Sequence, residues 1–545
     1  MLDSAYFYEE FFSSLFLTTR MCFFHFPQRA FPIVIVAVAL VAACTHAQTQ
    51  SPTPGSTYTT PRGNLALQAQ TLDVPAQFRS FVPSRAVNVP AGWRAKVFYA
   101  GNLLNKPRFM AWRSDSVLHV ADVNAGRIIA LPDRNRDGIA DTAIIAAANV
   151  FAHDVKFYNG AMFAAEERRV VRFTNPDRNG VYQTRTTFID NIAEGAMQPG
   201  GGHRTRTMVF DATRRKMYLS IGSLCNVCRE DARALIEEWN DDGTGRRVFA
   251  TGIRNAVGMA LHPRTGKLWA TNNGSDWQGN EIPPEWVDIV RDGGYYGYPV
   301  AHSYQAWFNF TAGTADYRAL LPITTADSAK VRRMVPPSAL LTAHSALMAL
   351  EFANPSFPPE FRRGAFVALR GSWNRQPLTG YKVVYLDFDN DADTVANSAT
   401  DFLTGFLTDS VRGERWARPV GLATDSKGNL YVGSDELTRF ILILTPNAAT
   451  NIREKSQLRG NLQIHPNPNS DNATAEFVLP ESGTAVLTLY DALGNCMATL
   501  ADGIFAAGEH RIPIHIPSSL RSSGLYFCRL QTNADVLTEP FFRVR

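Results

Sequence analysis

Residues that could carry chemistry gather first around a single histidine. His203 follows three glycines in the stretch MQPGGGHRTRTMVF, Met197–Phe210. Glycine triplets disfavour helix and strand, so this run predicts a turn that delivers His203 to the start of a strand. The unperturbed pKa of imidazole, about 6.5, lies close to working pH and suits a general base. From this stretch alone, the favoured interpretation is a histidine that only satisfies the turn.

Four further segments place arginine, asparagine or tryptophan beside glycine. They are FATGIRNAVGMALHP with Arg254 and Asn255, TNNGSDWQGNE with Asn273, Gly274 and Ser275, LRGSWNRQPLTGY with Trp373 and Arg375, and RWARPVGLA with Arg415 and Arg418. Guanidinium and amide groups that converge would bind an anionic, planar or oxygen-rich ligand. A structural contact between neighbouring elements is the alternative for Arg254 and Asn255. Surface salt bridges are the alternative for Arg375 and the favoured interpretation for Arg415.

A repeated strand pattern predicts how these segments are brought together. Six short apolar cores recur, mostly at intervals of about 45 to 65 residues: SVLHVAD, AMFAAE, KMYLSIGS, KLWATNN, GAFVALRGS and NLYVGSD. This repeat predicts an all-β fold, a six-bladed β-propeller over residues 87–446, with a pair of β-sandwiches as the alternative. The one helix-like segment is Arg229–Asn240. A propeller gathers the loops of different blades at one end, where we expect the polar segments to form a site.

The motifs GGHRTRT, FATGIRNAVGMALHPRTGKLWATNN, GGYYGYP, LRGSWNR and RPVGLA resemble the quinoprotein sugar dehydrogenase family, the soluble glucose and sorbosone dehydrogenases. The resemblance implies an enzyme that oxidises a sugar, polyol or aldose with pyrroloquinoline quinone (PQQ) and passes electrons to an external acceptor. In such an enzyme His203 would take the hydroxyl proton while hydride passes to the quinone. Arg254 would polarise the quinone oxygen, and Asn255 would donate a hydrogen bond beside it.

The same resemblance implies a cofactor and metal site. PQQ carries three carboxylates; Arg418 matches a family arginine that holds the cofactor, Arg375 is a candidate for the partner cation, and Trp373 could stack on the ring. Calcium would bind the backbone carbonyls of Gly274 and Ser275, while Asn273 would contact substrate. The loop here is less acidic than in soluble glucose dehydrogenase, and calcium, a hard cation, would need its oxygen ligands.

A second calcium signal stands apart, in DRNRDGIAD. Asp133, Asn135, Asp137 and Asp141 alternate, and glycine occupies the sixth position, as in the first half of an EF-hand loop. The distal glutamate of a full loop is missing. A structural Asx-rich turn is the alternative to a calcium site.

The cysteines predict disulfides rather than haem or zinc. Cys225 and Cys228 form a CNVC motif that is followed by Arg229, so it is not the haem motif, which requires histidine there. A single such pair is a weak zinc signal, and a local disulfide fits an exported protein. Cys496 and Cys528 could bridge two strands near the C-terminus.

The N-terminal region, residues 1–47, reads as an export signal. The apolar run Phe31–Cys44 follows Arg29 and ends in small residues. The VAAC stretch allows lipoprotein anchoring at Cys44, whereas the THA stretch suggests ordinary cleavage; an uncleaved membrane anchor is a further alternative. The acidic residues before Met21 suggest that Met21 is the true start. Residues 48–86 read as a linker and entry segment.

The C-terminal unit, residues 462–545, follows a second linker at 447–461 and alternates apolar and polar residues in short runs. This pattern predicts a small Ig-like β-sandwich. PNPNSD, LTLYDALGN, LADGIFAAGEH and SSGLYFCRL resemble the C-terminal sorting domain of type IX secretion cargo. That resemblance implies export by the type IX machinery across the outer membrane, then secretion or attachment at the cell surface. An ordinary Ig-like binding module is the alternative.

Composition narrows the classes of function. The 545 residues carry a formal net charge of only +4, which gives no argument for nucleic-acid binding. Three classes remain: the PQQ- and calcium-dependent oxidoreductase, a calcium-dependent propeller lactonase, and a non-catalytic propeller for surface adhesion. A lactonase needs acidic ligands around the axis, whereas the polar segments here are rich in arginine and asparagine.

Overall fold

The structure is a computed structural model that describes residues 52–543 apart from ten gaps. The gaps are 64, 114–116, 194–201, 313, 447–461, 468–472, 480–481, 492–495, 515–523 and 533–535. The export-signal assignments, Met21, Cys44, the second linker and the first two glycines before His203 lie outside the described residues. Among the described residues, no helix is both long and apolar enough to cross a bilayer.

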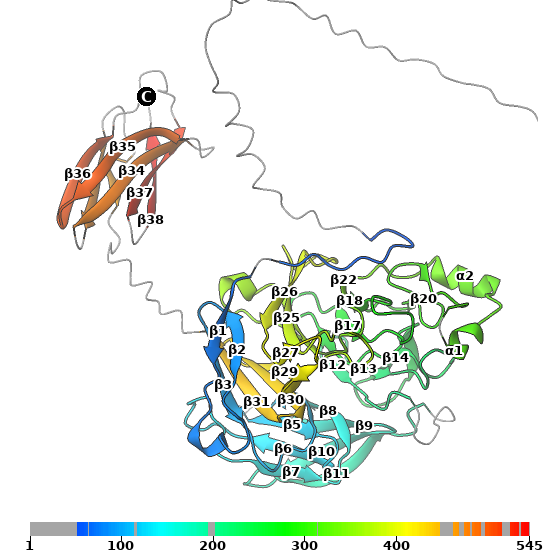
Figure 1. The fold of residues 1–545 in the computed structure, drawn as a ribbon. Coiled ribbons are helices and arrows are strands. Elements are labelled where there is room, and N and C mark those ends of the chain that lie inside the picture. Colours follow the sequence, from blue (N-terminus) through cyan, green and yellow to red (C-terminus); the bar gives the residue numbers. More distant parts are fainter. Residues whose placement is uncertain are drawn as a thin grey trace, which may run out of the picture. The chain divides into compact units, whose positions relative to one another are not determined.

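The fold is all-β, and from residue 93 to 446 it is a succession of antiparallel sheets (Figure 1). The first sheet contains β4 (Pro107–Trp112), β5 (Leu118–Asp122), β6 (Arg127–Leu131) and β7 (Ile144–Ala148). The second contains β8 (Ala152–Tyr158), β9 (Ala161–Glu166), β10 (Val170–Pro176) and β11 (Tyr182–Ile189). The third contains β12 (Met208–Asp211), β13 (Lys216–Ile221), β14 (Leu235–Asn240) and β15 (Arg247–Thr251), to which β19 (Gly294–Tyr295) adds in parallel.

Three further sheets complete this region. The fourth contains β16 (Met259–Leu261), β17 (Leu268–Asn272), β18 (Glu285–Ile289) and β22 (Ala339–Leu341). The fifth contains β23 (Leu347–Phe352), β24 (Ala365–Leu369), β25 (Lys382–Asp387) and β26 (Ser398–Leu403). The sixth contains β29 (Ala417–Thr424), β30 (Leu430–Leu437) and β31 (Phe440–Pro446), and it is completed by β3 (Trp93–Tyr99) from the start of the region. This arrangement agrees with a β-propeller.

Each repeated apolar core found in the sequence is the second strand of its sheet: β5, β9, β13, β17, β24 and β30. In an antiparallel sheet, the beginning of the first strand and the end of the second lie at one edge. His203 and Arg254 come before the first strands β12 and β16, whereas Asn273 and Trp373 follow the second strands β17 and β24. All four therefore lie at the corresponding edge of their sheets.

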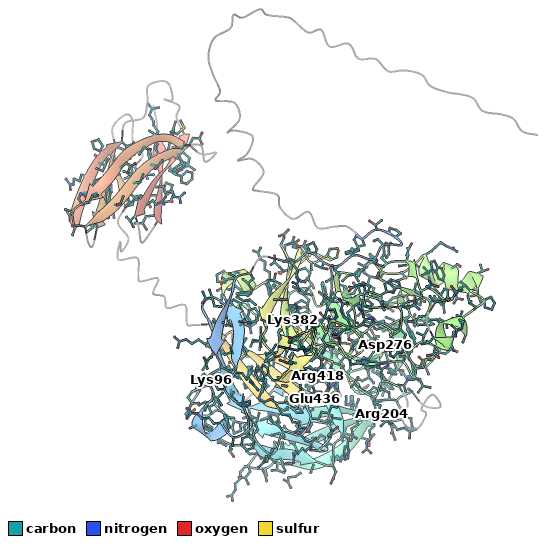
Figure 2. The ribbon with its side chains drawn as sticks, viewed as in Figure 1. Lys96, Arg204, Asp276, Lys382, Arg418 and Glu436 are labelled. Carbon is teal, nitrogen blue, oxygen red and sulfur yellow. A yellow bond between two sulfur atoms is a disulfide. The ribbon has the colours of Figure 1, made fainter. Side chains whose placement is uncertain are left out.

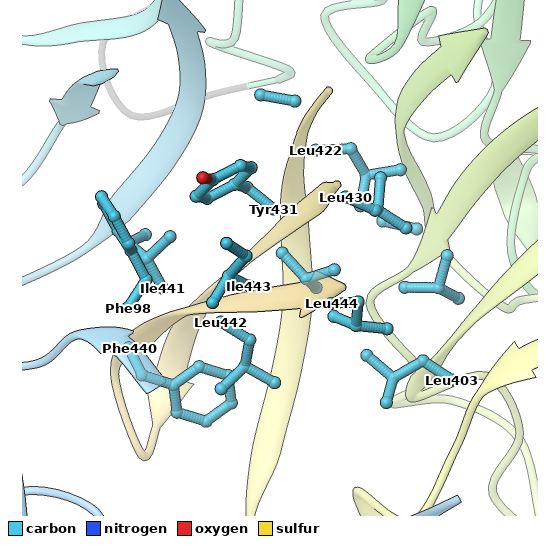
Figure 3. Close-up of a cluster of buried hydrophobic side chains, with 14 of the residues drawn as sticks. Phe98, Leu403, Leu422, Leu430, Tyr431, Phe440, Ile441, Leu442, Ile443 and Leu444 are labelled. Carbon is cyan, nitrogen blue, oxygen red and sulfur yellow. The ribbon is translucent and has the colours of Figure 1, made fainter. Parts of the chain in front are cut away.

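The junction between the first and last strands of the region is densely packed (Figure 3). β3 pairs with β31, with Val97 opposite Leu442, and Figure 1 shows the blue β3 beside the yellow strands. The run Phe440–Leu444 is almost completely buried. Each fully buried large aliphatic side chain stabilises the fold by about 1.5–3 kcal/mol, so this seam fastens the two ends of the region together.

The helix expected over Arg229–Asn240 is wrong. Its second half is strand β14, and its two glutamates are buried because neighbouring arginines pair with them. Glu237 Oε1 lies 2.6 Å from Arg246 Nη2, and Glu238 Oε1 lies 2.8 Å from Arg247 Nε, across the pairing of β14 with β15. Sheet pairing and these ion pairs override the helical preference of the segment.

A long insertion, residues 290–338, separates β18 from β22. It contains β19, the hairpin of β20 (Ala301–His302) and β21 (Ala306–Trp307), and the helices α1 (Ala315–Arg318) and α2 (Thr325–Val331). Its apolar residues form a separate core that also includes Val227 of the CNVC motif. Thr324 caps α2 through a reciprocal capping box with Asp327, and Asp327 also accepts two hydrogen bonds from Arg229 at 2.7 and 2.9 Å.

The remaining short elements lie at the margins. β1 (Leu67–Thr71) pairs with β2 (Ala86–Pro90), and β27 (Leu407–Asp409) pairs with β28 (Glu414–Arg415). Two 3₁₀ turns cover Ala76–Phe78 and Pro359–Phe361.

The C-terminal unit has two antiparallel sheets and a core of its own. One sheet contains β32 (Gln463–His465), β33 (Ala473–Leu479) and β36 (Gly508–Ile514). The other contains β34 (Gly483–Asp491), β35 (Cys496–Phe505), β37 (Gly524–Thr532) and β38 (Val536–Arg543).

The disulfide expected between Cys496 and Cys528 is wrong, because both thiols are free. Cys496 lies on β35 and Cys528 on β37, and the strand β34 runs between them. Neighbouring strands are about 4.8 Å apart, so two strands on either side of a third are separated by roughly 10 Å, beyond the Cα distance that a disulfide can span.

Candidate active site

The predicted polar segments meet at a large cavity of about 1040 Å³ at the shared edge of the sheets. His203, Arg254, Asn255, Asn273, Gly274, Trp373 and Arg418 all line it. Its other charged lining residues are Lys106, Arg108, Arg168, Arg169, Arg204 and Arg370 on the cationic side, and Glu166, Glu167, Asp190, Asp276 and Glu285 on the acidic side. Cations outnumber carboxylates, which favours an anionic ligand.

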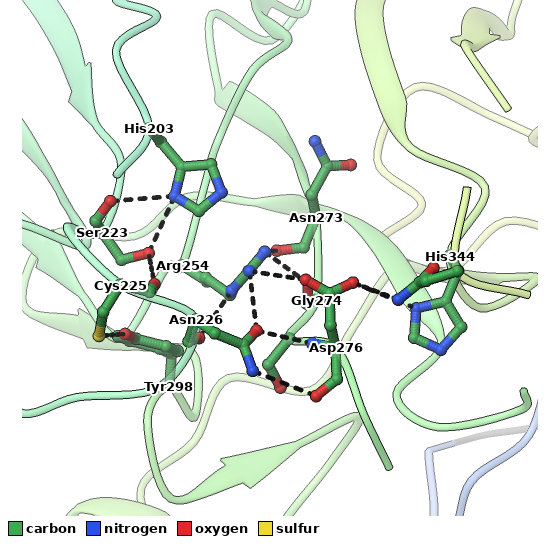
Figure 4. A network of polar contacts seen from close by, with 12 residues as sticks. His203, Ser223, Cys225, Asn226, Arg254, Asn273, Gly274, Asp276, Tyr298 and His344 are labelled. Carbon is green, nitrogen blue, oxygen red and sulfur yellow. Dashed lines mark hydrogen bonds and ion pairs between the residues drawn. The ribbon is translucent and has the colours of Figure 1, made fainter. Parts of the chain in front are cut away.

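The tautomer of His203 follows from its two partners (Figure 4). Nδ1 lies 3.0 Å from the backbone carbonyl of Ser223 and 3.0 Å from its hydroxyl. A carbonyl can only accept, and the Ser223 hydroxyl donates its own hydrogen to the carbonyl of Cys225 at 2.8 Å. Nδ1 therefore carries the proton, which leaves Nε2 of this half-buried ring as a hydrogen-bond acceptor.

The charge state of His203 follows from its surroundings. Burial and the nearby guanidinium of Arg254 lower the pKa of His203 to about 3. The ring is neutral at physiological pH and so can accept a proton, but its pKa lies well below the value near working pH that the sequence led us to expect.

Gly222 allows His203 and Asn255 to lie side by side. A Cβ atom at this position would stand 2.6 Å from both the Cβ of His203 and the Oδ1 of Asn255. No larger residue fits without displacing one of the two. The backbone N–H of Asn255 donates to Asn272 Oδ1 at 2.9 Å, which fixes the other side of the residue.

Arg254 is the hub of the polar network in Figure 4. Nε donates to the carbonyl of Asn226 at 2.9 Å, and Nη2 donates to the side-chain oxygens of Asn226 and Asp276 at 3.0 and 3.3 Å. Nη1 donates to the carbonyls of Gly274 and Asn273 at 2.6 and 3.4 Å. These acceptors can engage all five N–H groups of the guanidinium, so its principal role in this structure is to hold three backbone segments together.

Asp276 links this hub to the fifth sheet and was not predicted from the sequence. Its second carboxylate oxygen accepts a hydrogen bond from Asn374 Nδ2 at 2.5 Å and lies 3.9 Å from Nδ1 of His344. The segment SWN had been considered only for Trp373. Its neighbour Asn374 provides the contact with the fourth sheet.

Glu285 is a second carboxyl group that the sequence did not single out. Its Oε2 accepts the backbone N–H of Gly274 at 2.6 Å, and burial raises the pKa of Glu285 to about 8. The group is thus predominantly protonated at neutral pH. Its position on strand β18, in a run of buried residues, gave no sequence signal of a cavity.

A cationic network forms another side of the cavity, and two of its members, Arg418 and Glu436, are labelled in Figure 2. Arg108 Nη1 lies 2.5 Å from Asp435 Oδ2, Arg370 Nε lies 3.0 Å from Asp435 Oδ1, and Arg370 also pairs with Glu436. Arg418 donates to the carbonyl of Gly371 at 2.7 Å and lies 3.4 Å from Glu436. Burial opposes ionisation of Asp435, but Arg108 and Arg370 lower its pKa overall. The network fixes three guanidinium groups at the wall.

Lys106 adds a further positive charge beside this network. It is half-buried, and its ammonium makes no hydrogen bond or ion pair with any of the described residues. Burial lowers the pKa of Lys106, and the nearby Asp435 opposes that effect. Lys106 and Arg108 precede and begin β4, at the same edge as His203 and Arg254, and this shared position is the signal that could have found them.

Asn273 and Trp373 both line the cavity, as predicted, but they differ in exposure to solvent. The Asn273 side-chain oxygen is buried and has no hydrogen-bond partner in the described part of the chain. Trp373 is 65% exposed at the rim and meets Trp277 edge-to-face, with ring centroids 5.5 Å apart. An unpartnered buried oxygen and an exposed indole are both features that a ligand would complete.

Two predicted site residues, Arg375 and Ser275, do not reach the cavity. Arg375 is held by the carbonyl of Asn280 and by Glu281, whose carboxylate lies 2.6 Å away. Arg415, for which the sequence favoured a surface position, is exposed and donates to the carbonyl of Gly413 at 2.7 Å. Ser275 is buried away from the cavity, where its hydroxyl lies 2.8 Å from that of Tyr317, within hydrogen-bond distance.

The Asp133–Asp141 loop folds on its own hydrogen bonds. Asp133 accepts the backbone N–H groups of Asp137 and Gly138 at 3.1 and 3.0 Å, and Asp141 accepts that of Arg134 at 2.9 Å. Asn135 donates from Nδ2 to Asp137 at 2.9 Å. Over the described residues, these side chains do not form a set of three carboxylates close enough to share an ion. The loop therefore has the contacts of an Asx-rich turn, and its calcium site stays a prediction.

Cys225 and Cys228 are joined in a disulfide. The backbone N–H of Cys228 donates to the hydroxyl of Tyr298 at 3.0 Å, and Val227 packs into the core of the insertion. The two sulfurs lie near Glu230, but sulfurs bound to each other do not ligate a metal. The motif thus fastens the insertion to the wall that carries Ser223.

Residues 87–447 match the family model described as TrAA12-like. An uncharacterized protein of Borreliella burgdorferi is 25% identical over 355 residues, 64% of this chain and 88% of the relative. A pyrroloquinoline quinone-dependent sugar dehydrogenase of Hypocrea jecorina is 24% identical over 420 residues, 66% of this chain and 89% of the relative.

Two solved structures share the fold of the same region. The iodide structure of the Trichoderma reesei family AA12 enzyme superposes with a TM-score of 0.55 at 21% identity, covering 66% of this chain and 97% of that one. The holo form of the PQQ domain of Coprinopsis cinerea pyranose dehydrogenase superposes with a TM-score of 0.55 at 21% identity, covering 69% of this chain and 100% of that one.

Proposed function

We propose, from the premise that the chain belongs to the TrAA12-like family, that it is an exported quinoprotein oxidoreductase that oxidises a sugar, polyol or aldose. The names of the relatives support this class, since they include a PQQ-dependent sugar dehydrogenase and the PQQ domain of a pyranose dehydrogenase. The observation that carries the proposal is the neutral His203, whose unprotonated Nε2 belongs to a cavity rich in fixed cations.

The residues present fit PQQ, a planar tricarboxylate. Arg108, Arg370 and Arg418 are fixed at one wall, and Lys106 stands beside them without a partner among the described residues. The cavity volume of about 1040 Å³ is ample for a cofactor together with a small substrate. We therefore assign Lys106, Arg370 and Arg418 to the cofactor's carboxylates and Trp373 to its ring.

Bound PQQ would supply the acceptor for the two electrons of the substrate. His203 would accept the substrate hydroxyl proton at Nε2, and Ser223 would stabilise the resulting imidazolium because both of its oxygens face Nδ1. Arg254 would place Asn273 and Asp276 through its five donors, and Asn255 beside His203 would orient the substrate. The positive charge of the cavity would favour an anionic cofactor over water.

The calcium site does not fit the residues as they are arranged. The carbonyl of Gly274 already accepts Arg254 Nη1, the carboxylate of Asp276 is paired with the same guanidinium, and Ser275 is outside the cavity. A calcium ion here would require Arg254 to release both oxygens. Calcium therefore has no part in the proposed mechanism, and its role is tested by measuring PQQ binding with and without added calcium.

The decisive experiment pairs binding with turnover. His203→Gln should bind PQQ with the affinity of the wild type, because the ring is not assigned to a cofactor carboxylate. It should lose at least about a hundredfold in sugar-dependent dye reduction, the lower end of the contribution of general-base catalysis. The matched control is His465→Gln, an exposed histidine of the C-terminal unit.

Unchanged turnover in His203→Gln would show that His203 is not the general base. Failure of the wild type to bind PQQ would instead favour one of the two alternatives, a lactonase or an adhesion module. A lactonase would need acidic metal ligands, and within the described ranges the cavity contains no set of three such side chains that could share an ion.

The finer parts of the proposal rest on sequence. We assign six blades to the propeller, an export signal to residues 1–47 with lipoprotein anchoring at Cys44 as its variant, and an external electron acceptor. We also assign type IX sorting to the Ig-like unit at residues 462–545, on the motifs given above. Together these would place the enzyme outside the cell or at its surface.

A further inference from the structure

A second cleft of about 380 Å³ lies beside the active cavity. Its lining residues are Trp277, Gln278, Gly279, Ile282, His302, Trp307, Asn309 and Ala312. The chain has nine tryptophans, and the three that are exposed in the described part of it are Trp277, Trp307 and Trp373, at 50%, 40% and 65%. Two of these line the second cleft, and the third lines the active cavity.

The two cavities are joined by an aromatic pair. Trp277 of the cleft meets Trp373 of the active cavity edge-to-face, with centroids 5.5 Å apart and planes at 85°. A ligand that leaves the active cavity over Trp373 therefore meets Trp277 of the cleft.

Trp277 has a strained backbone conformation that accompanies the exposure of its side chain. Its φ angle is 75°, in the left-handed region, where a bulky residue is an outlier and costs free energy. The preceding carbonyl of Asp276 holds the chain there by accepting hydrogen bonds from Asn226 at 3.2 Å and Tyr317 at 2.9 Å. A costly conformation that presents an apolar side chain to solvent favours a role in binding.

Hydrogen bonds hold the walls of the cleft together without a ligand. Gln278 Nε2 donates to the carbonyls of Asn309 and Ala312 at 3.2 and 3.1 Å, and its oxygen accepts the N–H of Asn309 at 3.0 Å. Gln278 follows Trp277, whereas Asn309 and Ala312 lie on the insertion that carries Trp307. The two tryptophans thus stand on connected segments, which reduces the entropy lost on binding.

The charge of the cleft restricts its ligand. Its lining includes no aspartate, glutamate, lysine or arginine, in contrast to the cation-rich active cavity. Burial lowers the pKa of His302 to about 4, so this residue is also neutral at physiological pH. Exposed indole faces in an uncharged cleft suit the C–H faces of a neutral sugar ring, and they give no attraction to a charged protein surface.

We propose that the Trp277–Trp307 cleft is a subsite for the outer rings of a neutral oligosaccharide whose terminal ring enters the His203 cavity. This inference rests on the proposed function and extends it from single sugars to short glycan chains. In this proposal the insertion at residues 290–338 contributes one wall of the subsite, through residues such as Trp307 and Asn309.

The test compares chain lengths directly on the full chain, without cofactor. Glucose, xylose, cellotetraose, maltotetraose and xylotetraose are titrated by calorimetry and by tryptophan fluorescence. At least one tetrasaccharide should bind tenfold or more tightly than its monosaccharide. Trp307→Ala and Trp277→Gly should each abolish that gain and leave monosaccharide affinity unchanged. Phe81→Ala, an exposed aromatic outside both cavities, is the matched control.

Trp277→Gly separates display from a structural role. Glycine adopts positive φ freely, so the thermal midpoint should be retained or raised if Trp277 serves a ligand; a clear fall would assign the side chain to stability and overturn its part in the subsite.

Equal affinities for monosaccharides and tetrasaccharides across the panel would overturn the proposal even if sugar oxidation occurs. Conversely, Trp307-dependent tetrasaccharide binding in a protein that oxidises no sugar would support the glycan subsite and reject the proposed oxidoreductase activity. Trp307-dependent reduction of a protein electron acceptor, with no gain for any tetrasaccharide, would assign the cleft to that partner and overturn the glycan subsite.

Discussion

The lowered pKa of His203 should be visible in the pH dependence of turnover. A free histidine loses its proton-accepting form below pH 6.5, but burial and Arg254 lower the pKa of His203 to about 3. The basic form therefore persists as pH falls. We expect the kcat for sugar oxidation to show no histidine-type fall between pH 7 and pH 5.

Rates should be measured with two dyes of different pH dependence, so that the acceptor does not set the profile. Cofactor occupancy should be checked at each pH. A halving of kcat near pH 6.5 at full occupancy would contradict the assigned environment of the ring.

Lys106 provides a second prediction for a single residue. Its half-buried ammonium has no partner among the described residues and stands beside the fixed guanidinium groups of Arg108 and Arg370. An added charge-assisted contact contributes about 1.5–3 kcal/mol, so Lys106→Met should weaken PQQ binding roughly tenfold or more.

The comparison for Lys106→Met is Lys427→Met, because Lys427 is exposed and outside the cavity. Affinity should be read from a spectroscopic titration with PQQ. If both variants bind PQQ as the wild type does, the carboxylates of the cofactor do not lie against Lys106.

Strand β18 carries a prediction at the scale of an element. Glu285 and Asp288 are both buried on it, and burial raises the pKa of each to about 8. Between their unfolded pKa values, near 4, and pH 8, the folded state binds more protons than the unfolded state. Rising pH therefore favours unfolding, by at most about 1.4 kcal/mol per group for each pH unit.

The double variant Glu285→Gln/Asp288→Asn should remove this contribution, because both amides retain an oxygen for the N–H of Gly274 and the hydroxyl of Ser338. Urea unfolding from pH 5 to pH 9 gives the comparison. The wild type should lose stability relative to the variant up to about pH 8 and then remain parallel to it. Parallel curves across the whole range would show that these carboxyls are not protonated in the fold.

The elements differ in how far the sequence could reveal them. The second strand of every sheet was recognisable because it is short, apolar and bounded by turns. Strand β14 was not, since its two glutamates are buried only because Arg246 and Arg247, nine residues further along the chain, pair with them. The insertion was missed as well, because its hairpin and helices are short and its core depends on Val227 from another segment.

The residues of the site also differ in how far the sequence could reveal them. His203, Arg254, Asn255 and Arg418 stood beside glycines at comparable strand edges, so their convergence was predictable. Lys106, Asp276 and Glu285 occupy equivalent edges or buried strands without a distinctive motif. Arg375 had the motif but pairs with Glu281, because side-chain direction after β24 is decided by packing that the sequence does not show.

At the scale of the whole molecule, the cavity and the C-terminal unit are built from separate sets of residues. All the residues assigned to the cavity lie between Lys106 and Arg418. The C-terminal unit has two sheets and a hydrophobic core built from its own residues, Leu462 to Phe541. Each part has its own source of stability, so loss of one should leave the other folded.

A chain that ends at Pro446 tests this separation. Because β31 ends at Pro446 and completes the sixth sheet, the truncation retains every strand of the six sheets. We expect the purified truncated protein to keep its thermal midpoint to within about 2 °C and to bind PQQ as the full chain does, since a shift of that size corresponds to only about 1.5 kcal/mol at roughly 2.1 cal/mol/K per residue.

In the host, the same truncation should fail to reach the surface. If the C-terminal unit is the sorting signal, the truncated enzyme should accumulate in the periplasm, while the full chain should be accessible to antibody and protease on intact cells. Full-length His203→Gln is the control: it should be displayed like the wild type, because sorting does not require turnover. Surface display of the truncated chain, with its periplasmic pool unchanged, would reject the sorting role and leave the C-terminal unit as a binding module.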